Sequence, residues 1–176
     1  VRPPRALAEH FGRHALALAD ELVGAEPAHL GHLNRKVSIL DRVGRFEEAI
    51  AIYRGVLQRA PRQPRLLLTL GTMLKTIGEV DESIIAYRAA IALQPTHGEA
   101  WWSLANLKTF RFDAAQLALM QDTLARTDLV PEQRTCLEFA VAKALEDRAE
   151  YAAAFEHSPN GNTLRLEQIP YSADDT

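Results

Sequence analysis

The chain has 176 residues, of which 47% are hydrophobic and 24% charged, a soluble globular composition that excludes wholesale disorder and a fibrous protein. Its net charge of −3 supplies no basic field for a phosphate backbone, so nucleic acid is not an expected partner. No uncharged apolar stretch approaches the roughly 20 residues of a membrane span, so no membrane association is expected. The single cysteine, Cys136, excludes an internal disulfide and favours a reducing, cytoplasmic compartment.

The N-terminal segment lacks the apolar run of a signal peptide. Because the first residue is Val1 and not Met, we expect processing or excision from a longer protein. A first helix is predicted over about residues 4–24. It has no preceding helix to pair with, so residues 1–27 are interpreted as an end cap or as half of a partial repeat.

Two histidine pairs lie near the N-terminus at spacings that permit metal binding. His10 and His14 are four residues apart on the first predicted helix, and His29 and His32 flank the start of the second. Phe11 stands where a metalloprotease motif would have Glu, and no third ligand is evident. Solvated pairs are the default interpretation, so neither a metal nor another cofactor is predicted.

The middle of the chain repeats itself with an offset of 34 residues, as from Gly44 to Gly78. The other recurring pairs are Leu33 and Leu67, Leu40 and Leu74, Glu48 and Glu82, Ile50 and Ile84, Tyr53 and Tyr87, Arg54 and Arg88, and Pro61 and Pro95. A third copy begins at Trp101, which the repeat register directs into the core of its helix pair. The copy then decays, because Lys108 and Gln121 stand where bulky apolar residues are expected. A fourth copy is degenerate.

Each recurring residue has a mechanical role in a helix pair. Leu67, Leu70, Gly71 and Leu74 form one stripe of a helix, in which Gly71 permits a close helix approach. Gly78 ends that helix and permits a tight turn. A second apolar stripe follows and is closed by a proline that cannot continue a helix. The further predicted helices cover about residues 28–43, 46–59, 63–77, 80–93, 97–110, 113–126, 131–147 and 149–157.

This pattern of a large apolar residue, Leu-Gly, a mid-repeat Gly, an aromatic and a closing Pro resembles the tetratricopeptide repeat (TPR) family. The resemblance implies an all-α fold in which helix pairs stack into a right-handed superhelix, an α-solenoid, with the first helices on a concave face. Residues 28–157 are expected to form this array of three to four repeats. An ordinary helical bundle with accidental self-similarity is the less favoured alternative.

The end of the chain is predicted to leave the array. Ser158-Pro159-Asn160-Gly161-Asn162 is a strong breaker signal, so residues 158–176 are interpreted as a tail or a linker toward a missing domain. A short helix over Thr163 to Gln168 is compatible with this interpretation.

A narrower resemblance appears in the run Gly98-Glu99-Ala100-Trp101-Trp102-Ser103-Leu104-Ala105-Asn106-Leu107-Lys108-Thr109-Phe110-Arg111-Phe112. It is similar to the repeat region of bacterial proteins in which tetratricopeptide repeats precede a sulfotransferase domain. Segments at residues 74–76, 143–147 and 151–155, and Gly161-Asn162, agree in order and approximate spacing, whereas Pro159 departs, because such proteins would keep helix there. The resemblance implies a catalytic domain after residue 176. The chain itself contains no G-x-x-x-x-G-K-[ST] phosphate loop.

We therefore predict a non-catalytic module that binds a protein or peptide, or the protein's own downstream domain, with homo-oligomers also compatible. The alternative is a fragment of a sulfotransferase. Rotating each first helix with its leucine stripe toward the core leaves one set of residues facing a groove. The candidate groove residues are Asn34, Arg35, Ser38, Leu68, Thr72, Lys75, Trp102, Asn106, Phe139 and Lys143. Leu68, Trp102 and Phe139 are the expected anchors, although coverage by the chain's own tail or missing domain is weighed equally.

Overall fold

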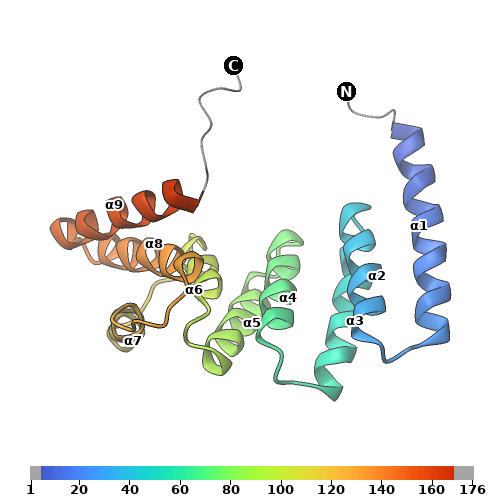
Figure 1. The fold of residues 1–176 in the computed structure, drawn as a ribbon, viewed down its shortest axis with the longest axis horizontal. Helices are drawn as coiled ribbons and strands as arrows, with labels where there is room; N and C mark the ends of the chain where they lie inside the picture. Colours follow the sequence, from blue (N-terminus) through green and yellow to red (C-terminus); the bar gives the residue numbers. More distant parts are fainter. Residues whose placement is uncertain (1–4, 169–176) are drawn as a thin grey trace. The chain divides into compact units, whose positions relative to one another are not determined.

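The computed structural model describes the backbone of residues 5–168 and the side chains of residues 12–157 and 160–162. Within that part of the chain the regular structure is entirely α-helical, with nine helices and no strand (Figure 1). In chain order they are α1 Arg5–Ala25, α2 Leu30–Arg42, α3 Phe46–Arg59, α4 Pro64–Thr76, α5 Val80–Leu93, α6 Gly98–Ala105, α7 Ala114–Leu124, α8 Pro131–Asp147 and α9 Tyr151–Gln168. The predicted all-α fold of repeated helix pairs is confirmed, and the handedness of the superhelix stays a prediction.

The helices divide into two compact units, each with its own core. The first holds residues up to 62 together with 73–80, and the second holds residues 63–72 and those from 81 onward. In the first unit α1 packs against α2 and α2 against α3. Its apolar core comes from one side of each helix, as the periodicity predicts. The core residues are Leu16, Ala19, Val37, Leu40, Ala49, Ile50, Tyr53 and Val56.

The two glycines at the repeat offset end their helices by the same turn. Gly44 has φ +77° and Gly78 has φ +90°, the left-handed region that side-chain-bearing residues rarely adopt. In each case the following amide reaches back to a helix carbonyl: Arg45 N donates to Leu40 O at 2.8 Å, and Glu79 N donates to Leu74 O at 2.9 Å. The predicted role of Gly78 as a helix stop is confirmed.

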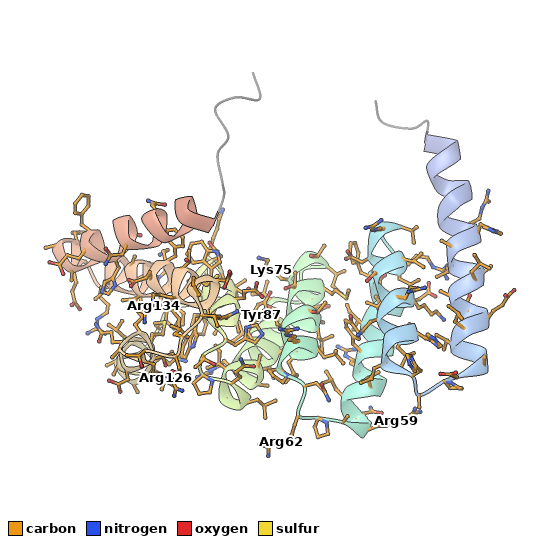
Figure 2. The ribbon with its side chains drawn as sticks, viewed as in Figure 1. Arg59, Arg62, Lys75, Tyr87, Arg126 and Arg134 are labelled. Carbon is orange, nitrogen blue, oxygen red and sulfur yellow. The ribbon has the colours of Figure 1, made fainter. Side chains whose placement is uncertain are left out.

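The second unit begins with a close contact between α4 and α5. A Cβ built on Gly71 would lie 2.6 Å from Cε1 of Tyr87, so this position accepts only glycine without a shift. Tyr87 itself is fully buried, and Figure 2 shows it between these helices. The predicted close approach at Gly71 is therefore confirmed.

Helix α6 is shorter than the predicted helix over 97–110. It ends at Ala105, and Asn106 caps it, with its backbone N–H directed to Leu104 O and Trp102 O. Leu107 and Phe112 then fold inward and are buried, so apolar burial continues without helix. Lys108, which interrupts the apolar stripe in the sequence, is exposed after the end of the helix.

The last described helix is longer than predicted. Helix α9 runs from Tyr151 to Gln168, so it passes through the expected break at 158–162 and includes the segment assigned to a separate short helix. Gly161 is buried against α8, where a Cβ would meet Phe139 Cε1 at 2.9 Å. Packing against α8 thus outweighs the local breaker signal. The rest of the predicted tail, 169–176, lies outside the described residues.

Candidate interaction surface

The candidate groove residues of α2 are all exposed in the first unit. Asn34, Arg35 and Ser38 lie on one side of the helix, and Ser38 Oγ donates to Asn34 O at 2.9 Å. Arg35 also lines a hollow of about 480 Å³ together with side chains of α1, including Leu18 and Leu22. This is a polar surface beside an apolar one.

The candidate residues of α4 are less free than predicted. Thr72 is exposed, but its Oγ1 donates to Leu68 O at 3.1 Å and accepts from the Tyr87 hydroxyl at 3.3 Å. Burial raises the pKa of Tyr87, so this hydroxyl stays protonated and available as a donor. Lys75 is exposed. Thr72 therefore helps to hold Tyr87, which sequence reasoning missed.

Leu68, the first expected anchor, is half-buried at the rim of a polar hollow of about 310 Å³. The other lining residues are Arg65, Thr69, Gln94, His97, Glu99 and Gln133. Burial lowers the pKa of His97, which favours a neutral imidazole, while the nearby Glu99 acts in the opposite direction. Polar neighbours make this hollow a poor apolar anchor site.

Trp102 and Phe139 form a ring pair between α6 and α8. Their ring centroids are 5.4 Å apart and their planes are inclined by 42°, a favourable tilted arrangement. Both side chains are half-buried, whereas the adjacent Trp101 is 1% exposed and donates its Nε1 proton to Pro95 O at 2.9 Å. The predicted placement of Trp101 in the core is confirmed.

Part of this ring pair is covered by the chain itself. Gly161 of α9 lies against the Phe139 ring, so the chain's own C-terminal segment covers part of this expected anchor. Trp102 is half-exposed. Within the second unit, the expected anchor Trp102 is thus half-exposed beside a partly covered Phe139.

Asn106 and Lys143 follow the two rings by one helical turn. Asn106 is four residues after Trp102 and donates its Nδ2 proton to Trp102 O at 3.0 Å. Lys143 is four residues after Phe139 and forms an ion pair with Asp147. We call Trp102, Asn106, Phe139 and Lys143 the α6–α8 surface. Because α6 packs against α8, these four candidates from two predicted repeats share one side of the second unit.

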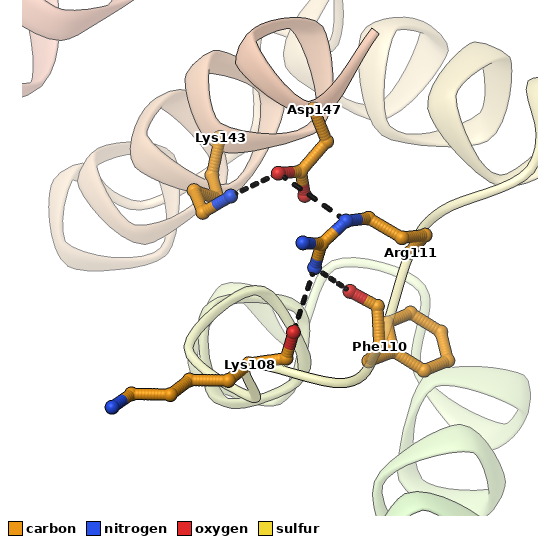
Figure 3. Close-up of polar contacts among 5 residues, drawn as sticks. All are labelled: Lys108, Phe110, Arg111, Lys143 and Asp147. Atoms are coloured by element: carbon orange, nitrogen blue, oxygen red, sulfur yellow. Dashed lines mark hydrogen bonds and ion pairs between the residues drawn. The ribbon is translucent and has the colours of Figure 1, made fainter.

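A cationic hollow shares Asn106 and Lys143 with this surface. Figure 3 shows the polar contacts of the charged side chains beside it. It measures about 250 Å³ and is lined by Ala105, Asn106, Leu107, Lys108, Arg111 and Lys143. Arg111 Nη1 donates to the carbonyls of Phe110 at 2.8 Å and Lys108 at 3.0 Å, while its Nε lies 3.5 Å from the Asp147 carboxylate. Arg111 and Lys143 both pair with the Asp147 carboxylate, and Lys108 adds a third cation to the lining, so the hollow carries excess positive charge.

Sequence reasoning missed Arg111 and Asp147. Arg111 lies just after the helix predicted over residues 97–110, and no groove position was assigned to it. The Lys143–Asp147 spacing of four residues was a usable signal, because i and i+4 side chains meet on a helix. Arg111 could not have been found, because its position depends on the early end of α6.

The remaining candidate sites have different outcomes. His10 belongs to the part of α1 whose side chains are not described, so the interpretation of His10 and His14 as a solvated pair stays a prediction. Cys136 is half-buried on α8. No described helix is both long and apolar enough to cross a membrane.

Comparison with known families gives two matches, both described as tetratricopeptide repeat. One covers residues 5–64 and the other covers residues 42–108. Together the two matches cover residues 5–108, from the start of α1 to just beyond the end of α6. The matches describe repeats, and neither describes a catalytic domain.

The chain is also similar to parts of longer bacterial proteins. It is 29% identical over 145 residues to Protein FlbA of Caulobacter vibrioides, covering 81% of this chain and 22% of that protein. It is 27% identical over 148 residues to Cellulose synthase 2 operon protein C of Komagataeibacter xylinus, covering 81% of this chain and 11% of that protein. The chain thus spans about a fifth or less of the length of these curated relatives.

Solved structures share the fold at low sequence identity. A crystal structure of MamA superposes with a TM-score of 0.64 at 14% identity, covering 97% of this chain and 100% of that one. The TPR-like repeats of a Podospora anserina kinesin light chain superpose with a TM-score of 0.60 at 13% identity, covering 94% of this chain and 95% of that one. These likenesses support the fold alone.

Proposed function

Because the chain belongs to the tetratricopeptide repeat family, we propose that it is a non-catalytic module that binds a protein or peptide through the α6–α8 surface. The observation that carries this proposal is the half-exposed Trp102–Phe139 ring pair beside the cationic hollow. Aromatic side chains that are partly open in a free protein often dominate binding when a partner buries them. The compartment we propose is cytoplasmic, on the ground of the single cysteine.

The charges beside the rings define the partner's chemistry. Lys108, Arg111 and Lys143 surround the hollow, and Asp147 compensates only part of their charge. A carboxylate entering the hollow would meet at least two cations in a partly desolvated setting, where charge-assisted hydrogen bonds are strongest. We therefore propose a peptide segment that places an apolar side chain on the rings and an Asp, Glu or terminal carboxylate in the hollow.

Selection from a random peptide library, followed by calorimetry on the selected peptides, tests this proposal. We expect enrichment of segments with an apolar residue close to a carboxylate. Trp102→Ala should weaken their binding by about 30-fold, the equivalent of about 2 kcal/mol for a buried aromatic anchor. Lys108→Ala should weaken the same peptides, whereas Arg88→Ala, which removes an exposed charge from α5, should not.

The adjacent tryptophan is the folding control. Trp101→Ala should lower the free energy of unfolding by about 3 to 5 kcal/mol, because it empties a buried site. Trp102→Ala should cost much less stability. The proposed surface is wrong if Trp102→Ala destabilises the chain as severely as Trp101→Ala does. It is also wrong if the selected peptides bind Trp102→Ala and Lys108→Ala as tightly as the unmodified chain.

A second candidate partner is a following domain of the same polypeptide. The resemblance of the Trp101-Trp102 run to repeat regions that precede a sulfotransferase domain supports this alternative, as does the small share of the curated relatives that the chain spans. The reading frame of the natural protein tests it. A phosphosulfate-binding loop encoded soon after Thr176 would support it, and a frame without a sulfotransferase domain would overturn it.

A further inference from the structure

Three potential metal ligands meet at the turn between α1 and α2. Glu26, His29 and His32 each offer one ligand atom, and these three atoms lie within 4.8 Å of one another. The sequence analysis considered His29 and His32 but did not include Glu26. Glu26 thus adds a third potential ligand to the pair of His29 and His32.

The backbone of this turn brings the three residues to one side. His29 N donates to Glu26 O at 3.1 Å, and His32 N donates to His29 O at 3.0 Å. Each of these hydrogen bonds joins residues three apart, so two successive turns bring the three side chains together. The arrangement is built by the protein's own backbone and does not need an ion to bend the chain.

The two imidazole rings are already close. Their centroids are 4.1 Å apart and their planes are inclined by 35°. Gly31 provides room for this, because a Cβ at that position would lie 2.9 Å from Cε1 of His29. A side chain on residue 31 would therefore displace the His29 ring from its place beside His32.

One nitrogen of these two rings is buried without a hydrogen-bond partner among the described residues. His32 Nδ1 is buried and has no hydrogen-bond partner in the described part of the chain. His29 Nδ1 accepts only a long bond of 3.3 Å from His32 N, as the N-cap of α2. A buried imidazole nitrogen without a partner is unfavourable, and a bound cation would supply one.

We propose that Glu26, His29 and His32 bind a divalent transition metal of the zinc class. Two imidazole nitrogens and one carboxylate are a ligand set that zinc uses, whereas calcium and magnesium prefer oxygen ligands throughout. Ligand atoms about 2.0–2.2 Å from a tetrahedral ion lie about 3.4 Å apart, so modest side-chain rotations close the site. The fourth position is open to water or to a ligand from a binding partner.

Isothermal titration of the full chain with zinc alone, without a polyhistidine tag, tests this site. We expect one zinc per chain and a rise in melting temperature with added zinc, because an ion that binds only the folded state stabilises it. His29→Asn keeps a side chain that can cap α2 while it removes the imidazole. Zinc binding should weaken at least tenfold in each of three variants: His29→Asn, His32→Gln and Glu26→Gln. The helix content measured by circular dichroism should be unchanged in all three.

His14→Gln is the matched control, because it removes the other histidine spacing that permits metal binding. It should bind zinc as the unmodified chain does. The site is overturned if the unmodified chain does not bind zinc or if any of the three ligand variants binds it unchanged. Loss of binding in His14→Gln would assign the metal to α1 and equally overturn it.

Discussion

At the residue scale, the positions with the strongest steric constraints were the most predictable. The apolar stripe places Trp101 in the core and the repeat pattern places Gly71 at a helix contact, and both expectations are confirmed. The burial of such residues depends on the adjacent helix of the repeat, and the repeat period specifies which helix that is. The roles of Arg111 and Thr72 were missed, because each depends on a contact that no spacing rule specifies.

Gly71→Leu should destabilise the chain by roughly 1 to 3 kcal/mol. Even a Cβ would lie 2.6 Å from the Tyr87 ring, so a larger side chain must displace a fully buried aromatic. Chemical denaturation monitored by circular dichroism measures the change.

Gly55→Ala provides the matched control in another helix. Nothing lies within 4 Å of a Cβ built on Gly55 in α3, so the substitution adds no clash. It should stabilise the protein by about 0.4 to 1 kcal/mol, because alanine loses less backbone entropy on folding. An unchanged unfolding midpoint in Gly71→Leu would contradict the close contact.

At the element scale, some helix boundaries follow from local sequence signals, whereas others depend on packing against a neighbouring helix. Most predicted helices agree with the structure within a few residues, because Gly44, Gly78 and the prolines carry explicit stop signals. The end of α6 and the extent of α9 were predicted wrongly. In α6 the capping by Asn106 prevails over a continuing apolar pattern, and in α9 the contact with α8 prevails over Pro159.

Gly161→Leu should loosen α9 from α8. A Cβ at this position would lie 2.9 Å from the Phe139 ring, so a leucine side chain must displace either the ring or the helix. The free energy of unfolding should fall by roughly 1 to 3 kcal/mol. Relative to the unmodified chain, amide exchange should accelerate more in α9 than in α4 and α5. Hydrogen exchange followed by mass spectrometry measures both regions.

Asn162→Ala is the control for α9. Asn162 is exposed in the same helix, so its truncation should leave amide exchange close to that of the unmodified chain. Equal exchange rates in Gly161→Leu and Asn162→Ala would show that Gly161 does not hold α9. The breaker signal at residues 158–162 would then describe this segment better than its helical packing does.

At the scale of the whole molecule, the repeat period predicts the fold class but leaves the partner open. Residues at the 34-residue offset carry the information for packing one helix on the next, so an all-α repeat fold follows from them. The ten candidate groove residues belong to two compact units, and four of them share the α6–α8 surface of the second unit. Whether the others join them stays a prediction.

The last prediction concerns catalysis by the chain as a whole. Its 176 residues contain no G-x-x-x-x-G-K-[ST] loop, and its matched family models describe repeats. We therefore expect no saturable micromolar binding of a phosphosulfate nucleotide in calorimetry, and no sulfate transfer from it. The cationic hollow beside Lys108 and Lys143 is a part of the described surface that would attract such an anion.

Competition separates that attraction from a nucleotide site. Binding to the hollow by charge alone should weaken steeply with added salt, and inorganic sulfate should compete as well as the nucleotide does, because exposed charges are screened. A nucleotide complex that persists at high salt and resists sulfate would require contacts to the base and sugar. That outcome would contradict a non-catalytic repeat module, since those contacts define a cofactor site within this chain.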